Sequence, residues 1–304
     1  MVGGPTRSLI AALLGLASVI ALATCAAPAA TGSPAAGPAI AVLGTENFYA
    51  DLLTQIGGTR VTVSSILNDP NADPHEYEAN PQTAKLVADA KLVIVNGIGY
   101  DDFMDKLLGA STKPERIVIS VQDILSKSND DNSHVWYDPK TMPAVAAAAT
   151  AALAKLDPPN ADYFAAQKAK YLGALKPIDD KIAALKAKYS GAPVAFTEPV
   201  EAYQAEAIGL KVLTPEGFMK AIEQGVDPAP ADVAGERDLL TGKRVKALLY
   251  NSQVTSPLTQ GIYDLAVKSG VPVVGVAETI PTKFKTYQEW MLSQLAELET
   301  ALAK

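Results

Sequence analysis

The chain has 304 residues, which is enough for two domains of ordinary size. Because 48% of the residues are hydrophobic and 19% are charged, the chain can bury a sizeable core, and this excludes a disordered protein. The formal net charge is -7, and no basic stripe is present, which argues against a nucleic-acid partner.

The N-terminus has the pattern of a targeting segment. Residues 9–23 form an uncharged apolar run that has the length of a signal-peptide core and is short for a bilayer-spanning helix. The run leads into residues 22–25, Leu-Ala-Thr-Cys, which resemble the lipobox of bacterial lipoproteins. We therefore expect residues 1–25 to be a signal peptide that ends at Cys25, the only cysteine, and Cys25 to be lipidated. The alternative is cleavage within residues 26–30 and release of a secreted protein.

The following residues, 26–38, are rich in Ala, Gly, Pro, Ser and Thr and predict a flexible tether. From residue 39 onward apolar strand patterns alternate with helical ones, which is typical of an α/β sheet with mostly parallel strands. We assign residues 39–158 to a first lobe. Its predicted strands are Ile40–Thr45, Arg60–Leu67, Leu92–Val95 and Arg116–Ser120.

One long helix is predicted over Ala161–Tyr189, where apolar residues recur at roughly three- to four-residue spacing. At about 1.5 Å per residue it would run roughly 40 Å, more than one lobe needs. We interpret residues 159–190 as a rigid helix joining two lobes; the alternative is a surface helix of a single domain. A second series of strands and helices fills residues 191–304. The predicted fold class is therefore α/β, with two lobes, each a mostly parallel sheet flanked by helices.

The only two histidines lie in similar short segments. His75 lies within Asp73–Pro81 and His134 within Ser133–Pro139, and each segment contains an Asp-Pro dipeptide and an aromatic residue after the histidine. Proline restricts its own backbone and that of the preceding residue, so both segments are predicted to be rigid loops. Both follow predicted strands, where ligands bind in open parallel sheets. Two such loops favour a pair of metal ligands over two structural histidines.

Other chemistries lack their residues. The sequence contains no Gly-x-Ser-x-Gly elbow, no His-Glu-x-x-His helix and no phosphate-binding loop of the required spacing. Two imidazoles bind a divalent ion weakly, so carboxylates are needed as well. Glu198 and Glu278 stand out because each follows a predicted strand of the second lobe. Comparable acidic candidates are Glu201, Glu216, Glu223 and Asp264.

Taken together, these motifs resemble the solute-binding lipoproteins of zinc and manganese ABC importers. The resemblance is carried by the Asp-Pro-His segment at residues 73–77, by residues 96–103 (Asn-Gly-Ile-Gly-Tyr-Asp-Asp-Phe), and by the His-x-Trp-x-Asp-Pro loop at residues 134–139. It implies two lobes, one rigid helix between them and a metal buried in the cleft. Asn251 stands where members of that family often have Glu.

The resemblance implies the ligand set His75, His134, Glu198 and Glu278. Two carboxylates that can bind bidentately favour Mn²⁺ slightly over Zn²⁺ on ligand hardness and coordination number, with ferrous iron third. The implied function is capture of this ion outside the cytoplasm and its delivery to an ABC permease and its ATPase. The protein would be a monomer, not an enzyme, held by its lipid anchor on the outer face of the bacterial cell membrane.

Two other functions use the same residues. The first is a secreted metal-dependent hydrolase, which would need an open coordination position for water. The second is a surface adhesion module in which the metal is only structural.

Overall fold

The computed structural model describes residues 1, 3, 4, 38–69, 74 and 77–304. Contacts divide the chain into two units, Met1–Ala36 and Gly37–Lys304, and all that follows concerns the second. Cys25 and His75, together with most of the predicted signal peptide and tether, lie outside the described residues.

The first lobe is built on a sheet of four parallel strands in the order β2-β1-β3-β4. The central strands β1 and β3 are apolar runs that are almost wholly buried, as expected where helices cover both faces of a parallel sheet. The strands are β1 (Ile40–Glu46), β2 (Val61–Leu67), β3 (Leu92–Val95) and β4 (Ile117–Ser120). The helices are α1 (Asn47–Gly57), α2 (Pro81–Asp89), α3 (Phe103–Ala110), α4 (Val121–Leu125) and α5 (Thr141–Leu156), with short 3₁₀ turns η1 (Gly58–Arg60), η3 (Val135–Tyr137) and η4 (Pro158–Asn160).

The second lobe repeats this arrangement with the parallel order β6-β5-β7-β8. Its strands are β5 (Pro193–Phe196), β6 (Lys211–Val212), β7 (Leu248–Asn251) and β8 (Val273–Val276). Its helices are α7 (Ala202–Ile208), α8 (Glu216–Glu223), α9 (Pro230–Thr241) and α10 (Pro257–Ser269). The predicted fold class, two lobes with mostly parallel sheets flanked by helices, is confirmed.

Local signals set several helix starts. The Asn80 side chain accepts hydrogen bonds from the backbone of Gln82 and Thr83, and Pro81 occupies the first helical position of α2. Ser256 caps α10 in the same way through Thr259. These capping boxes hold the chain direction where it leaves a loop and enters a helix.

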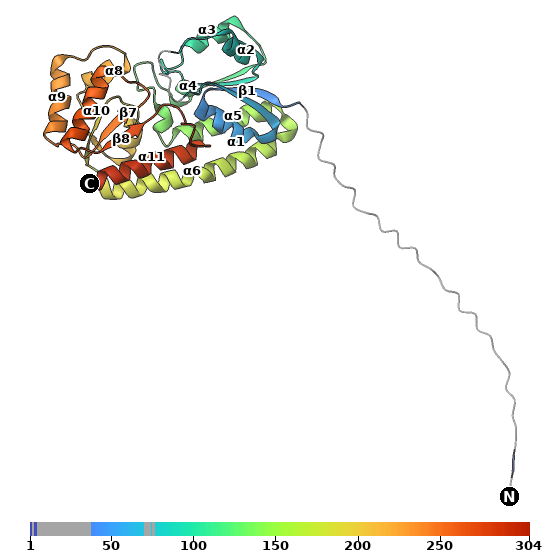
Figure 1. The fold of residues 1–304 in the computed structure, drawn as a ribbon. Coiled ribbons are helices and arrows are strands. Elements are labelled where there is room, and N and C mark those ends of the chain that lie inside the picture. Colours follow the sequence, from blue (N-terminus) through green and yellow to red (C-terminus); the bar gives the residue numbers. More distant parts are fainter. Residues whose placement is uncertain (2, 5–37, 70–73, 75–76) are drawn as a thin grey trace. The chain divides into compact units, whose positions relative to one another are not determined.

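Two long helices, α6 (Ala161–Tyr189) and α11 (Tyr287–Leu302), run side by side along the molecule (Figure 1). The bounds of α6 are those predicted from the sequence, residues 161–189. Its buried residues are Phe164, Tyr171, Leu175, Ile178, Ile182 and Leu185, and they belong to one hydrophobic core that includes side chains of both lobes. Across the described residues, no helix combines the length and the apolar character required to cross a membrane.

Candidate metal centre

Three buried polar side chains of the second lobe meet at one edge of its sheet. Glu198 lies two residues beyond β5, Asn251 is the last residue of β7, and Glu278 lies two residues beyond β8. Because these strands are parallel and adjacent in the order β5-β7-β8, their carboxyl ends lie side by side. Glu198 is 2% exposed, while Asn251 and Glu278 are fully buried.

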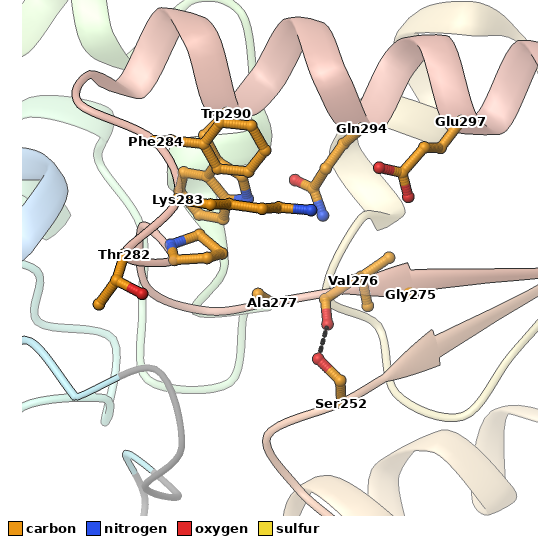
Figure 2. Close-up of a pocket in the computed structure, with 11 residues that line it drawn as sticks. Ser252, Gly275, Val276, Ala277, Thr282, Lys283, Phe284, Trp290, Gln294 and Glu297 are labelled. Carbon is orange, nitrogen blue, oxygen red and sulfur yellow. Dashed lines mark hydrogen bonds between the residues drawn. The ribbon is translucent and has the colours of Figure 1, made fainter.

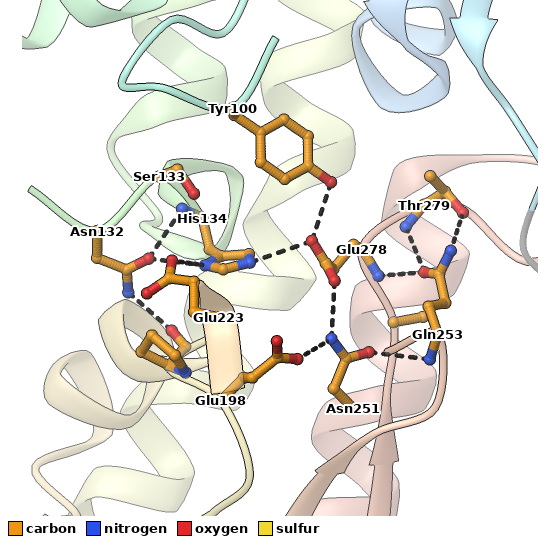
Figure 3. Close-up of polar contacts among 12 residues, drawn as sticks. Tyr100, Asn132, Ser133, His134, Glu198, Glu223, Asn251, Gln253, Glu278 and Thr279 are labelled. Carbon is orange, nitrogen blue, oxygen red and sulfur yellow. Dashed lines mark hydrogen bonds and ion pairs between the residues drawn. The ribbon is translucent and has the colours of Figure 1, made fainter. Parts of the chain in front are cut away.

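His134 reaches the same place from the first lobe (Figure 3). Its backbone N–H donates to the side-chain oxygen of Asn132 at 3.0 Å, and its ring Nδ1 lies 2.7 Å from the same oxygen. The Asn132 amide in turn donates to the carbonyl oxygen of Pro199 at 2.7 Å. An amide oxygen can only accept, so Nδ1 carries a hydrogen and the Nε2 atom is directed at the second lobe.

The Nε2 atom of His134 lies 3.2 Å from Oε2 of Glu278, and both side chains are fully buried. Two ligand atoms that are each about 2.0–2.1 Å from a tetrahedral zinc ion lie about 3.3 Å from one another. The observed separation therefore fits two ligands of one cation.

Tyr100 adds a second contact across the lobes. Its hydroxyl donates to Oε2 of Glu278 at 3.0 Å. Burial and the neighbouring Glu278 carboxylate raise the pKa of Tyr100 well above its usual range, so the phenol keeps its hydrogen and remains a donor.

The turn before Tyr100 has an unusual backbone that is held by a carboxylate. Gly97, Ile98 and Gly99 all have positive φ, and the value at Ile98 is 58°. Asp101 accepts hydrogen bonds from the backbone nitrogens of Asn96 at 2.8 Å and Gly97 at 2.7 Å. A β-branched residue rarely adopts this conformation, so the turn is strained. The hydrogen bonds to Asp101 offset this strain, and the turn in this conformation positions the Tyr100 ring.

Asn251 joins the two acidic side chains. Its amide nitrogen donates to Oε2 of Glu198 and, at 2.7 Å, to Oε1 of Glu278. Gln253 holds the backbone of the same segment, because its Oε1 accepts from the nitrogens of Glu278 at 2.5 Å and Thr279 at 3.0 Å. Two carboxylates are thereby kept close together in a buried place.

Further buried acids lie in the first lobe. Glu46 is the last residue of β1 and is fully buried, and burial followed by the nearby Asp101 raises its pKa well above the usual range. Burial also raises the pKa of Asp101 to about 6. Both carboxyl groups therefore hold their protons more tightly than exposed acids do.

Two cavities lie near the site. One of about 480 Å³ is lined by residues of both lobes, including Tyr100, Ser133 and Glu223. The other, about 410 Å³, lies between the end of β8 and α11 (Figure 2). Ser252 and Ala277, the chain neighbours of Asn251 and Glu278, line the second cavity, but none of the predicted ligands does.

The structure brings together three of the four predicted ligands, His134, Glu198 and Glu278, and the fourth, His75, lies outside the described residues. Among the alternative acids, only Glu223 approaches them, with Oε1 3.7 Å from Nδ1 of His134. The others lie elsewhere: Glu201 is buried and within electrostatic reach of Glu297, Glu216 forms an exposed pair with Lys220 at 2.8 Å, and Asp264 accepts from Gln260 on α10.

Within the described ranges, no three or more His, Cys, Asp or Glu side chains are grouped so as to hold a metal ion. His134 and Glu278 are in contact, whereas Glu198 is joined to Glu278 through an amide. No role was predicted for Tyr100, Asn132 or Gln253. Asn251, noted in the sequence only because the family often has Glu there, ends β7 beside the two glutamates.

A protein-family model described as "zinc-uptake complex component A periplasmic" (ZnuA) matches residues 42–301. The chain belongs to this family. A manganese-binding lipoprotein, MntA of Halalkalibacterium halodurans, is 27% identical over 153 residues, which cover 49% of this chain and 51% of the relative. The chain spans about half the length of the curated relatives it matches.

Solved structures of similar fold extend over more of the chain. The periplasmic zinc-binding protein TroA from Treponema pallidum matches with a TM-score of 0.74 at 19% identity, covering 86% of this chain and 99% of that one. FpvC from Pseudomonas aeruginosa, solved in complex with Mn²⁺, matches with a TM-score of 0.71 at 20% identity, covering 87% and 98%. These likenesses confirm the two-lobe fold of the family.

Proposed function

We propose that this protein captures a divalent transition metal, Mn²⁺ or Zn²⁺, outside the cytoplasm and delivers it to an ABC permease driven by an ATPase. The proposed ligands are His75, His134, Glu198 and Glu278. The observation that carries the proposal is the 3.2 Å approach of a buried imidazole of one lobe to a buried carboxylate of the other. Family membership and relatives that bind manganese or zinc support it.

The charges at this place favour a cation. Glu198 and Glu278 are both almost inaccessible to water, and a divalent ion bound by two carboxylates has its charge neutralised where desolvation is costly. Four protein ligands would fill a tetrahedral coordination shell and leave no position for an attacking water. This supports a binding and transport role over hydrolysis, so we propose that the protein is not an enzyme.

The location follows from the N-terminal segment. We propose that Cys25 is lipidated and holds a monomeric protein at the outer face of the bacterial cell membrane. The full-length protein should partition into the detergent phase of a two-phase detergent extraction, and Cys25→Ala should move it to the aqueous phase. Sedimentation of the mature chain should give the mass of a monomer, and a dimer mass would contradict that part of the proposal.

Metal binding can be tested by thermal unfolding after removal of bound metal with a chelator. At a hundredfold excess over Kd, a ligand that binds only the folded state adds about 2.7 kcal/mol of stability. We expect Zn²⁺ or Mn²⁺ to raise the Tm of the wild type and of the control variant Glu216→Gln, whose exposed side chain pairs with Lys220. No shift with either ion would overturn the proposed function.

A further inference from the structure

We infer that the cavity between β8 and α11 binds a small zwitterion, an α-amino acid that carries both an ammonium and a carboxylate group. The cavity measures about 410 Å³, and none of the proposed metal ligands lines it (Figure 2). Binding of an amino acid there is a second activity beside the proposed capture of metal.

Strand β8 has a free edge at this cavity. It is the last strand in the order β6-β5-β7-β8, so among the described residues no strand pairs with its outer side. The carbonyl oxygen of Val276 accepts from the backbone nitrogen of Ser252 at 3.0 Å and therefore faces β7. Successive residues of a paired strand direct their peptide groups to opposite sides, so Gly275 and Ala277 face away from β7. The carbonyl oxygen of Ala277 agrees with this direction, because it accepts from the Tyr137 hydroxyl at 2.7 Å.

Gly275 leaves its own peptide groups open at this edge. It is exposed and lines the cavity, and its backbone N–H and C=O make no hydrogen bond with any residue that the structure describes. Neither packing nor backbone geometry requires a glycine at this position, because an added Cβ would meet no atom within 4 Å and the φ angle is not positive. A glycine inside a strand often marks a place where a ligand approaches the backbone closely. The cavity thus contains one unpaired donor and one unpaired acceptor from the same residue.

Two oppositely charged side chains line the same cavity. Lys283 lies on the segment that follows β8 and Glu297 lies on α11, and neither forms an ion pair within the described part of the chain (Figure 2). The Lys283 ammonium lies 4.8 Å from the centroid of the Phe284 ring, and Oε1 of Glu297 accepts from the Ser293 hydroxyl at 3.3 Å. The indole N–H of Trp290, another lining residue, is buried without an acceptor among the described residues. Buried donors without a partner are rare in native proteins, so an acceptor is expected there.

These groups match an α-amino acid better than other ligands. The Gly275 N–H, the Trp290 N–H and the Lys283 ammonium can bind a carboxylate. The Gly275 carbonyl and Glu297 can bind an ammonium. A simple anion would meet the like charge of Glu297, and a simple cation would meet that of Lys283. Addition of a peptide strand needs several open residues in a row, but Val273, the other residue of β8 that faces away from β7, does not line the cavity.

The test measures binding of L-alanine to the metal-free mature protein by saturation-transfer NMR. Propionate and ethylamine are the comparators, because each keeps only one of the two charged groups of alanine. We expect both comparators to bind at least about tenfold more weakly than L-alanine, since each loses hydrogen bonds that involve a charged group. Absence of transfer to L-alanine, or a comparator that binds as tightly as L-alanine, would overturn the inference.

Two variants with matched controls locate the binding. Lys283→Gln and Glu297→Gln each remove one exposed charge from the cavity and should weaken L-alanine binding by about tenfold or more. Lys285→Gln and Glu289→Gln remove the same charges from the same segment and helix, at exposed positions that do not line the cavity, and should bind as the wild type does. Thermal unfolding checks that all four variants are folded. Wild-type affinity in both Lys283→Gln and Glu297→Gln would overturn the inference and leave the proposed capture of metal intact.

Discussion

The two lobes share a strand order but contribute different chemistry to the site. The first lobe supplies an imidazole and a phenol from loops whose backbones are held by Asn132 and Asp101. The second supplies two carboxylates directly beyond strand ends, joined by the Asn251 amide. The first-lobe imidazole is therefore oriented by its own loop, whereas the two second-lobe carboxylates share one amide donor between them.

The largest expected effect comes from removing the ligand of the first lobe. His134→Ala deletes the only imidazole among the described residues and should weaken Zn²⁺ binding by more than about 100-fold, since loss of an outer partner of a ligand already costs 10–100-fold. Isothermal titration calorimetry of the metal-free protein measures this loss. The control Glu216→Gln should bind as the wild type does. Wild-type affinity in His134→Ala would show that the acidic lobe binds metal by itself.

The next effect concerns the stability of the second lobe. Burial, and secondarily Glu297, raise the pKa of Glu201 from 4.5 to about 8. The folded state therefore prefers the protonated form. The free energy of unfolding is therefore highest below about pH 4.5, where Glu201 is protonated in both states. It falls as pH rises and levels off above about pH 8.

Glu201→Gln cannot ionise, so its stability advantage over the wild type should vanish near pH 4.5 and grow by about 1.4 kcal/mol for each pH unit up to about pH 8. Urea unfolding of the metal-free proteins at several pH values measures this difference. Glu216→Gln, at an exposed position, should show no such trend. A constant offset between Glu201→Gln and the wild type would contradict a buried, protonated Glu201.

A smaller effect tests the contact between lobes. Tyr100→Phe removes only the hydroxyl that donates to Glu278 and should weaken Zn²⁺ binding by about tenfold, the low end for an outer partner of a metal ligand. Tyr171→Phe is the control, because the Tyr171 hydroxyl is buried on α6 and makes no hydrogen bond with any residue that the structure describes. Equal calorimetric affinities in the two variants would show that Glu278 is positioned by the second lobe alone.

The smallest expected effect tests whether surface charge helps to hold the two long helices together. Lys181 on α6 pairs with Glu299 on α11, and their side chains are 28% and 36% exposed. Because a partly exposed ion pair is worth about 0–1 kcal/mol, Lys181→Ala should lower the free energy of unfolding by less than about 1 kcal/mol. Lys176→Ala, which breaks an exposed pair within α6, is the control in the same urea titration.

Much of this architecture was predictable from local sequence. The apolar spacing over residues 161–189 predicted the bounds of α6. The tendency of ligands to bind beyond the ends of parallel strands pointed to Glu198 and Glu278. Helices α8 and α9 were not predicted. Glu216–Glu223 is only eight residues long, and Pro230–Thr241 contains few apolar residues, so their helical state depends on packing of Phe218, Leu239 and Leu240 in the lobe.

The supporting contacts were beyond local prediction. The role of Asn251 depends on bonds to Thr197, 54 residues away, and to Glu198 and Glu278 on two other segments. The position of Tyr100 depends on positive φ at Ile98, which nothing in the side-chain pattern indicates. The lobe boundaries, Cys25 and His75 stay predictions.

The shared core limits how far the two lobes can separate. Phe48 of the first lobe stacks near Trp290 of α11 with ring centroids 6.4 Å apart, and Tyr287 of α11 donates to the carbonyl oxygen of Trp136 at 2.6 Å. A wide hinge rotation would separate these aromatic rings and expose them to water, which is unfavourable. Tyr100 and His134 pack edge-on against Trp136, whose ring stacks on Phe48, so the first-lobe groups that contact Glu278 belong to the same aromatic cluster.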